Sequence, residues 1–404
     1  MKCVNMNNQK EHAMKKQIGI LTATRAEFGL LKPLIKRLSK EEFCDTKVLV
    51  TGAHLSHAFG DTYKEIEEAG IQIATKIECL TEGDRPVDIS YNMAMAIKGF
   101  GRYFDENHLD LLVVLGDRYE TLAVCIAAMN AGIPIAHIHG GEATEGLIDE
   151  AVRHSITKMS HLHFPCAEEY RKRIIQMGEQ PKHVYNVGAL AVENTKNTEL
   201  MTREELSKDI GIDLTKDYAV VTFHPVTLEE NSGVDQIDQL LMALDEFPEM
   251  SFVITKANAD AGGRDINRRI DAYADQRKNV VAVTSLGAKR YLSAIKECRA
   301  VIGNSSSGII EAPCFHIPTV NIGDRQKGRI MPKSVLSCTP EKEEIVNTIK
   351  TAFNDSFREK ALRAENPFGE GKTSEMITEI IRAEFEKNKS IDIVKEFYDI
   401  GVDK

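Results

Sequence analysis

The sequence of 404 residues contains no tryptophan, and no apolar run approaches the roughly 20 residues that a membrane-spanning helix needs. The polar N-terminus lacks the apolar core of a secretory signal peptide. Lys and Arg number 51 against 61 Asp and Glu, which gives a net charge of −10 and no positive field for nucleic acid or an anionic membrane. We therefore expect a cytoplasmic protein that binds neither.

Cysteine and histidine form no pattern typical of a metal or disulfide site. The eight cysteines are scattered without a C-x-x-C pair, which argues against a zinc site or a disulfide framework. His54 and His57 are three residues apart, but we identify no cysteine or carboxylate at ligand spacing beside them. No G-x-G-x-x-G motif closes the first strand, which disfavours NAD. We expect no metal and no cofactor.

The chain is long for one hydrophobic core and suits two domains. Apolar strand-like runs alternate with helix-like segments in both halves, which predicts an α/β fold of two parallel-sheet domains with a cleft between them. We expect a disordered extension over 1–16, with Met14 as an alternative start, domains over 17–188 and 189–375, and a helix within 376–404 that crosses back to the first domain. Within these domains we expect, among other elements, strands over 17–24, 111–115, 133–138 and 184–187 and helices over 89–106, 309–315 and 376–398.

Charged side chains follow two apolar strands in the first half. The strand over 111–115 ends in Gly116-Asp117-Arg118, and the strand over 133–138 ends in His139-Gly140-Gly141-Glu142. A helix then begins at Asp149-Glu150, whose carboxylates are also suited to helix capping alone. Because ligands bind at the carboxyl ends of parallel strands, this density of acidic and basic groups favours acid–base chemistry on a small molecule.

The second half carries signals for a phosphate. The stretch 303–308, GNSSSG, lies between a strand and a helix, where hydroxyls and helix-start amides can bind an anion; a Ser-rich helix cap is the alternative. His224 follows another strand, and Arg325 and Arg329 follow a third; an arginine pair beside hydroxyls and helix amides suits a diphosphate. Glu311 is placed to accept hydrogen bonds from ribose. In the first half, Arg25 suits either a phosphate contact or a solvated turn.

Seven motifs follow one another in order along the chain. They are TRAEFG (24–29), GDR (116–118), HIHGGE (137–142), RHSITKMSHLH (153–163), FHPVT (223–227), GNSSSG (303–308) and GDRQKGR (323–329). From Met14 onward the chain resembles the hydrolysing UDP-N-acetylglucosamine 2-epimerases of bacterial sialic-acid synthesis. The resemblance implies the B-type glycosyltransferase fold of two Rossmann-like domains, conversion of UDP-GlcNAc and water to N-acetylmannosamine and UDP, and a homo-oligomer, either a dimer or a tetramer.

The resemblance also assigns roles to individual residues. Asp117 and Asp149 match positions implicated in catalysis. Many relatives carry a glutamate where this chain has His139, whereas Glu142 is kept, so one of these two takes the acid–base role and we expect both to be essential. Positions implicated in holding UDP match Arg25, His224, Ser305, Ser306, Glu311 and Arg325, and we add Arg118, Ser307 and Gly308 from the same motifs.

The chemistry explains why such groups are needed. The proton on C2 of the sugar is not acidic, because no carbonyl is attached to that carbon. Cleavage of the anomeric C–O bond gives C1 oxocarbenium character, which acidifies C2, and a diphosphate clamp stabilises the leaving UDP. A carboxylate or histidine takes the C2 proton, and water then adds to the glycal with protonation from the opposite face. Inversion at C2 therefore requires two acid–base groups.

Three other functions are compatible with the motifs. A sister 2-epimerase would act on UDP-N,N'-diacetylbacillosamine, which differs around C4 and C6 of the sugar. A glycosyltransferase of the same fold is disfavoured, because the carboxylate-rich first domain would be superfluous and no acceptor-binding surface is evident. A non-catalytic UDP-sugar sensor would bind tightly without turnover.

Overall fold

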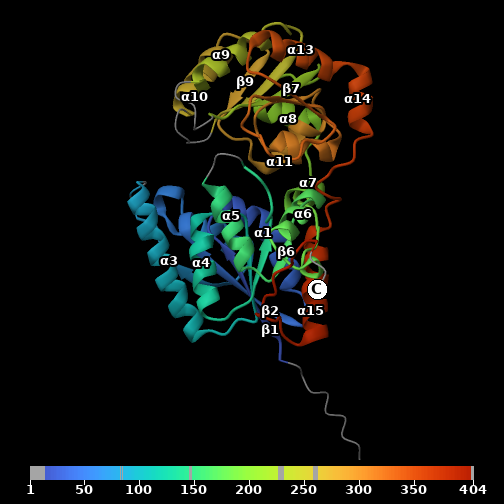
Figure 1. Cartoon of the computed structure of the whole chain (residues 1–404). Helices are drawn as coiled ribbons and strands as arrows, with labels where there is room; N and C mark the ends of the chain where they lie inside the picture. The colour runs from blue at the N-terminus through green and yellow to red at the C-terminus, as the bar shows by residue number, and fades with distance from the viewer. Residues whose placement is uncertain are drawn as a thin grey trace, which may run out of the picture. The chain divides into compact units, whose positions relative to one another are not determined.

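The computed structural model describes residues 14–81, 83, 85–144, 148–225, 232–257 and 263–401. These residues fall into two compact units (Figure 1). The N-terminal unit takes in the described residues up to Gly141, residues 148–187 and the chain from Ser374 onward, and the C-terminal unit takes in the described residues of 142–147 and residues 188–373. Residues 1–13 of the expected extension lie outside the described residues, as do residues 226 and 227 of the FHPVT motif.

The N-terminal unit is built on a six-stranded parallel sheet in the order β3-β2-β1-β4-β5-β6. The central strand β4 reads Leu-Leu-Val-Val-Leu and is buried along its whole length, which is typical of a parallel sheet covered on both faces. Its neighbours are in register, with Ile18 of β1 opposite Leu111 of β4. The strands are β1 (Lys16–Thr22), β2 (Cys44–Thr51), β3 (Ile73–Ile77), β4 (Leu111–Leu115), β5 (Ile135–Ile138) and β6 (Leu162–Phe164).

Helices alternate with these strands, as the sequence predicts for an α/β fold. The first begins at a capping box in which Thr24 accepts from the N–H of Glu27, and Glu27 accepts from the N–H of Thr24. The helices of this unit are α1 (Arg25–Leu38), α2 (Tyr63–Glu68), α3 (Pro86–Glu106), α4 (Tyr119–Asn130), α5 (Asp149–Met159), α6 (Glu168–Gln176) and most of α15 (Thr373–Asn388), with short 3-10 helices η1 (Gly52–Leu55), η2 (His57–Phe59) and η3 (Pro181–His183).

The C-terminal unit repeats the plan with a second six-stranded parallel sheet, in the order β12-β11-β10-β7-β8-β9. Phe223, Phe252 and Ile302 are buried in its core. Its strands are β7 (Tyr218–Thr222), β8 (Ser251–Thr255), β9 (Val280–Val283), β10 (Val301–Gly303), β11 (Thr319–Ile322) and β12 (Val335–Cys338). Its helices are α7 (Leu190–Asn197), α8 (Arg203–Ile210), α9 (Ser232–Leu244), α10 (Gly263–Ala274), α11 (Gly287–Lys296), α12 (Ser307–Ile310), η4 (Ala312–Phe315), α13 (Lys342–Phe353) and α14 (Asp355–Leu362).

Two parallel sheets flanked by helices confirm the predicted α/β class, but three predicted elements are wrong in detail. Residues 184–187 make a single bridge, at Val184, and no regular strand. The helix expected over 309–315 breaks into α12 and η4, because Pro313 has no N–H to continue the ladder. The helix expected to reach residue 398 ends at Asn388. Among the described residues, no helix has the length and apolarity needed to cross a bilayer.

The end of the chain beyond α15 is held by tertiary contacts that override its helical pattern. Lys395 Nζ donates to the carbonyl oxygen of Lys158 at 2.7 Å and pairs with Glu179 Oε2 at 2.8 Å. The N–H of Tyr398 donates to the carbonyl oxygen of Gly178 at 2.9 Å. Local propensity is a weak preference that such contacts outweigh.

Gly303, at the end of β10, is a position where only glycine fits. Its φ is +132°, and a Cβ there would lie 1.9 Å from the carbonyl oxygen of Thr222. We expect Gly303→Ala to destabilise the C-terminal unit by about 3 kcal/mol or more, through overpacking against backbone and a strained φ. Scanning calorimetry measures the change.

The matched control is Gly29→Ala in α1. A Cβ at Gly29 meets no described atom within 4 Å. Alanine there is expected to be neutral or to stabilise the helix by up to about 1 kcal/mol. Equal melting temperatures for the two variants would contradict the packing argument.

Candidate active site

A chain of alternating charges connects the end of β4 to α5 in the N-terminal unit. The carboxylate of Asp117 accepts a hydrogen bond from the guanidinium of Arg153, whose residue is only 2% exposed. Arg153 also pairs with Glu150 Oε2 at 2.9 Å, and Glu150 Oε1 lies 3.1 Å from Nε2 of His154. Burying a guanidinium is costly unless carboxylates compensate it, so this network ties α5 to the sheet.

Asp149 begins α5 beside this network. Burial raises the pKa of the half-buried Asp149, and the nearby charge of Asp117 raises it further, while Arg153 lowers it. A carboxyl group that keeps its proton more readily than usual is suited to act as an acid. The protonation of Asp149 is therefore coupled to the charges of both Asp117 and Arg153.

His137 and the two glycines after His139 shape the same edge of the sheet. The carbonyl oxygen of Gly116 lies 2.8 Å from His137 Nε2 and can only accept, so Nε2 carries the proton. Burial lowers the pKa of His137 to about 3, so the ring is neutral. A Cβ on Gly140 would lie 2.9 Å from His137 Nδ1, and Gly141 has a φ of +77°. His137 is therefore a structural residue, and the glycines are required by close contact and backbone conformation.

His139 sits where the backbone turns sharply after β5. Its φ is +66°, in the left-handed region that non-glycine residues rarely adopt, and its N–H donates to the carbonyl oxygen of Phe164 at 3.0 Å. Side-chain donor atoms of His139, Glu142 and Cys166 all lie within 4.8 Å of one another. His139 and Glu142, the two candidates for one acid–base role, are thus neighbours. All three side chains are also of types that bind metal ions.

The two arginines of the N-terminal unit that are expected to contact phosphate are paired with carboxylates. Arg118, just before α4, makes a two-pronged ion pair with Glu120, with N···O distances of 3.1 and 2.8 Å. Glu120 is fully buried, so this pair fixes the guanidinium of Arg118. Arg25 is largely exposed and lies 3.0 Å from Glu65. Arg118 is therefore held in place by the fold, whereas Arg25 is on the surface.

Glu27 was not recognised from the sequence as a member of this edge. Its Oε2 accepts the N–H of Ala23 at 2.7 Å, while Oε1 is shielded from solvent and has no hydrogen-bond partner among the described residues. Burial raises the pKa of Glu27 to about 7. Glu27 differs from an ordinary capping-box residue because its Oε1 is buried and unsatisfied among the described residues.

The two histidines of the first half that were considered as metal ligands do not face each other. His54 is buried with its ring nitrogens 3.0 Å from Thr22 Oγ1 and 2.8 Å from Thr62 Oγ1. His57 is exposed and lies 3.0 Å from Asp61, so the expectation that no carboxylate lies near was wrong. His54 is satisfied by hydroxyls, and its pKa is lowered to about 4 by burial.

In the C-terminal unit Asn304 joins the ends of two strands. Its Oδ1 accepts the N–H of His224 at 2.8 Å, and its Nδ2 donates to the carbonyl oxygen of His224 at 2.8 Å. The carbonyl oxygen of Asn304 accepts from Arg325 at 3.1 Å and from Gln326 at 2.8 Å. This one residue therefore brings His224, the serine loop and Arg325 to the same edge of the sheet.

The serine loop leaves hydroxyls that do not cap the helix behind it. Ser306 precedes α12 and makes no side-chain cap hydrogen bond. Ser305 Oγ accepts a long bond, 3.4 Å, from the N–H of Ser307 and another, 3.2 Å, from the hydroxyl of Ser307. Ser307 is tied to the hydroxyl of Tyr291. A Cβ on Gly308 would lie 2.6 Å from Thr319 Cγ2, so glycine allows α12 to approach β11. The hydroxyls of Ser305 and Ser306 are thus poorly explained by capping.

Glu311 follows α12 and carries an unsatisfied oxygen. Its Oε2 is shielded from solvent and finds no hydrogen-bond partner among the described residues. Burial raises the pKa of Glu311 to about 7, although the charge of Arg329 opposes this. A buried carboxyl oxygen without a partner costs free energy, and a ligand that donates hydroxyl hydrogen bonds would remove that cost.

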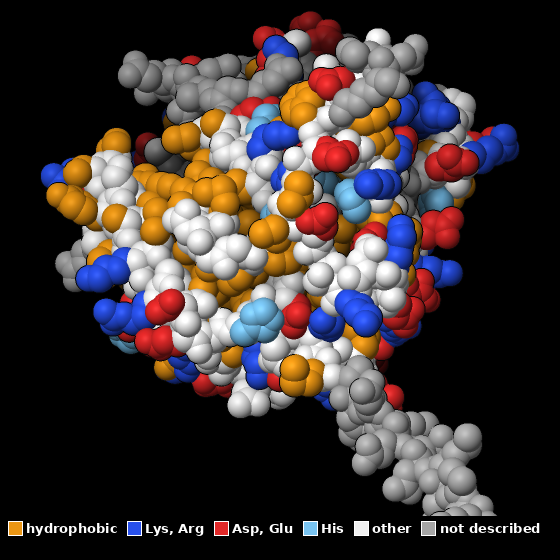
Figure 2. Space-filling model, turned by 60° about the horizontal axis from the view of Figure 1, so that its bottom comes forward, with side chains coloured by type: hydrophobic (Ala, Val, Ile, Leu, Met, Phe, Trp, Pro, Cys, Tyr) orange, Lys and Arg blue, Asp and Glu red, His pale blue; other side chains and the backbone are white. Residues whose placement is uncertain are grey.

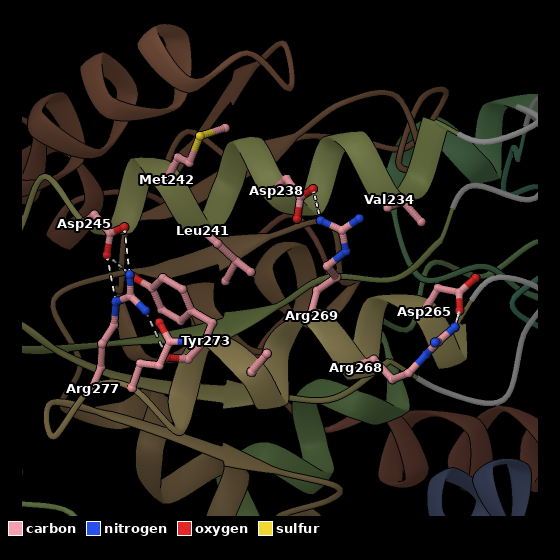
Figure 3. Close-up of a pocket in the computed structure, with 12 residues that line it drawn as sticks. Val234, Asp238, Leu241, Met242, Asp245, Asp265, Arg268, Arg269, Tyr273 and Arg277 are labelled. Carbon is pink, nitrogen blue, oxygen red and sulfur yellow. Dashed lines mark hydrogen bonds and ion pairs between the residues drawn. The ribbon is translucent and has the colours of Figure 1, made fainter.

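A cavity of about 710 Å³ in the C-terminal unit lies between α9 and α10, away from the serine loop and Glu311 (Figure 3). Its arginines are paired with aspartates that lie on these helices or just after them: Arg277 with Asp245, Arg269 with Asp238 and Arg268 with Asp265. Paired charges offer little to a phosphate, so the serine loop is the better candidate for an anion.

Comparison with known proteins decides the family. A family model described as UDP-N-acetylglucosamine 2-epimerase matches residues 36–382. The chain belongs to this family. "Polysialic acid biosynthesis protein P7" of Escherichia coli is 39% identical over 386 residues, 95% of this chain and 98% of that protein. The "GDP/UDP-N,N'-diacetylbacillosamine 2-epimerase (hydrolyzing)" of Campylobacter jejuni is 40% identical over 340 residues, 84% of this chain and 87% of that protein.

Solved structures confirm the fold of the epimerase family for this chain. The UDP-GlcNAc 2-epimerase of Neisseria meningitidis superposes with a TM-score of 0.78 at 18% identity, over 91% of this chain and 100% of the other. A UDP-N-acetylglucosamine 2-epimerase from Listeria monocytogenes gives a TM-score of 0.76 at 17% identity, over 96% and 100% of the two chains. The predicted pair of Rossmann-like domains, as in B-type glycosyltransferases, is therefore correct.

Several residues of the candidate site were missed from the sequence. Arg153 and Glu150 were noted only as part of a charged helix start, and Asn304 only as part of the serine loop. A buried arginine pairs across 36 residues with Asp117, which no local pattern reveals. The usable signal for Glu150 and Arg153 is their spacing of three, which places them on one face of a helix.

Removing the cation from the buried network provides a test. Arg153→Met would leave Asp117 and Glu150 without their shared partner, and we expect the N-terminal unit to lose about 3–5 kcal/mol of stability. Arg25→Met removes the exposed pair with Glu65 and should cost at most about 1 kcal/mol. Urea unfolding followed by circular dichroism compares them, and similar costs would show that Arg153 does not hold α5 in place.

Proposed function

We propose that the protein is a hydrolysing UDP-N-acetylglucosamine 2-epimerase that converts UDP-GlcNAc and water to N-acetylmannosamine and UDP for sialic-acid synthesis. The observation that carries the proposal is the pairing of the buried Arg153 with the partly exposed Asp117 and Glu150, with Asp149 beside them. A glycosyltransferase or a sugar sensor has no need of such an acid–base set. Family membership and the relative named for polysialic acid biosynthesis support the same reading.

The C-terminal unit is proposed to hold UDP. Hydroxyls of Ser305 and Ser306 and the guanidinium of Arg325 would bind the diphosphate, with Ser307 and Gly308 shaping the loop. Glu311 would accept hydrogen bonds from the ribose, and His224 lies at the same edge through Asn304. Positive charge and hydroxyl donors there stabilise UDP as the leaving group.

Residues that follow β4 and β5 are proposed to move protons at C2. The C1–O bond breaks with its electron pair going to UDP, and a base takes the C2 proton to leave a glycal. Water then adds its oxygen to C1 and gives up a proton to a base, while an acid delivers a proton to the other face of C2. His139 and Glu142 form one candidate pair and Asp117 and Asp149 another, and Arg118 is placed beside them for a phosphate oxygen, with Arg25 as a surface contact.

The reaction is tested by an NMR time course in D2O with UDP-GlcNAc. We expect release of UDP together with N-acetylmannosamine that carries deuterium at C2. His139→Asn and Glu142→Gln should each lower turnover at least about a hundredfold, as loss of a general acid or base does, while the exposed control Glu359→Gln should not. Turnover near the wild-type rate in both site variants would remove these two residues from the mechanism.

A second candidate substrate is UDP-N,N'-diacetylbacillosamine, because the Campylobacter jejuni relative that is 40% identical is named for it. The same time course with this sugar distinguishes the two. Deuterium incorporation with it alone would assign the legionaminic-acid pathway. UDP binding by calorimetry without turnover of either sugar would favour the sensor.

Glu311 offers a separate test of UDP binding. Its carboxyl group, with a pKa near 7, must be ionised to accept two ribose hydroxyls, so UDP should bind more tightly as the pH rises from 6 to 8. Below its pKa the expected slope is up to about tenfold in affinity per pH unit. Glu311→Gln should bind more weakly and lack that part of the slope. Identical pH profiles by calorimetry would exclude the proposed ribose contact.

A further inference from the structure

The turn after β5 and the turn after β6 lie side by side. The N–H of His139 donates to the carbonyl oxygen of Phe164 at 3.0 Å, so the end of β5 is hydrogen-bonded to the end of β6. Cys166 comes two residues after Phe164 and is only 2% exposed. Because neighbouring parallel strands end at the same edge of a sheet, they bring the imidazole of His139 and the thiol of Cys166 to one place.

The turn that leads to Glu142 is fixed against α6. The guanidinium of Arg173 donates to the carbonyl oxygen of Gly141. A Cβ on Gly141 would lie 2.5 Å from the carbonyl oxygen of Tyr170, so the backbone approaches α6 as closely as only glycine allows. Glu142 is the next residue, and its position follows from this contact between the turn and the helix.

Three side chains of metal-binding type meet at this edge. The donor atoms of His139, Glu142 and Cys166 lie within 4.8 Å of one another. A tetrahedral zinc ion holds such atoms about 3.4–3.6 Å apart, and small rotations of the half-buried His139 and Glu142 side chains close the difference. We propose that these three residues bind a thiophilic divalent cation such as Zn²⁺, with water as the fourth ligand. The sequence pattern predicted no metal, because Cys166 lies far along the chain from the other two.

The ligand types determine which cation fits. Imidazole and thiolate suit Zn²⁺ and Co²⁺, whereas Mg²⁺ and Ca²⁺ are bound by sets of oxygen atoms. The thiol of Cys166 loses its proton to solvent when the metal–sulfur bond forms, because the thiolate is the ligand. The thiolate and the carboxylate of Glu142 then balance the two positive charges of the ion. The site should therefore discriminate strongly against Mg²⁺.

Zinc bound here inhibits the reaction, an effect that rests on the proposed function. His139 and Glu142 are one candidate acid–base pair of that function. A metal ion bonded to the imidazole nitrogen and the carboxylate oxygen occupies the lone pairs that would accept a proton. Cys166 is not among the proposed acid–base groups, so it is the position at which metal binding and turnover can be separated.

Binding is measured on the full chain without substrate, so the result is independent of the reaction. Co²⁺ bonded to a thiolate absorbs intensely in the near ultraviolet. We expect a single Co²⁺ per chain with this absorption, displaced by Zn²⁺ and not by Mg²⁺. Loss of an outer-shell partner alone costs about 10–100-fold in metal affinity, so Cys166→Ala should weaken zinc binding at least about a hundredfold. Cys166→Ser repeats the test if circular dichroism shows that the alanine variant is unfolded.

Two control variants test whether other groups of the chain bind the metal. Cys125 is a buried thiol in the apolar core of the same unit, and burial raises its pKa, so Cys125→Ala should bind zinc as the wild type does. Figure 2 shows histidine side chains scattered over one face of the molecule. His57 is an exposed histidine 3.0 Å from Asp61, and His57→Ala should also leave binding unchanged.

Turnover with and without zinc tests the inhibition. Micromolar Zn²⁺ should stop the wild-type reaction, a chelator should restore it, and Cys166→Ala should keep its rate at the same zinc concentration. Absence of the thiolate absorption, equal zinc affinity in Cys166→Ala or equally tight binding of Mg²⁺ would overturn the cation site. Normal zinc binding by a chain that turns over neither sugar would contradict the proposed function and leave the cation site standing.

Discussion

The buried guanidinium of Arg153 is the interaction on which the N-terminal part of the site depends. Its desolvation is tolerable only because Asp117 and Glu150 approach it from two elements, the end of β4 and the first turn of α5. The same cation opposes the effects of burial and of Asp117 on the pKa of Asp149. One ion network therefore sets both where α5 lies and how strongly its first carboxyl group holds a proton.

In the C-terminal unit a neutral side chain, that of Asn304, joins the elements that carry the site. Asn304 uses its amide as both donor and acceptor toward the backbone of His224 and so ties β10 to β7. The backbone carbonyl oxygen of the same residue accepts from Arg325 and so holds a guanidinium at that edge, which suits a site for an anion. In the N-terminal unit, by contrast, carboxylates surround the arginine, which suits proton transfer more than phosphate binding.

Local patterns predicted the strands that carry the site, and distant contacts explain what was missed. The run Leu111–Leu115 followed by Gly-Asp-Arg is a signal contained in eight residues, and it placed Asp117 correctly at a strand end. Arg153 could not be assigned in this way, because its partner Asp117 is 36 residues away. The wrong helix beyond Asn388 has the same cause, since Lys395 is held by Lys158 and Glu179, more than 200 residues earlier.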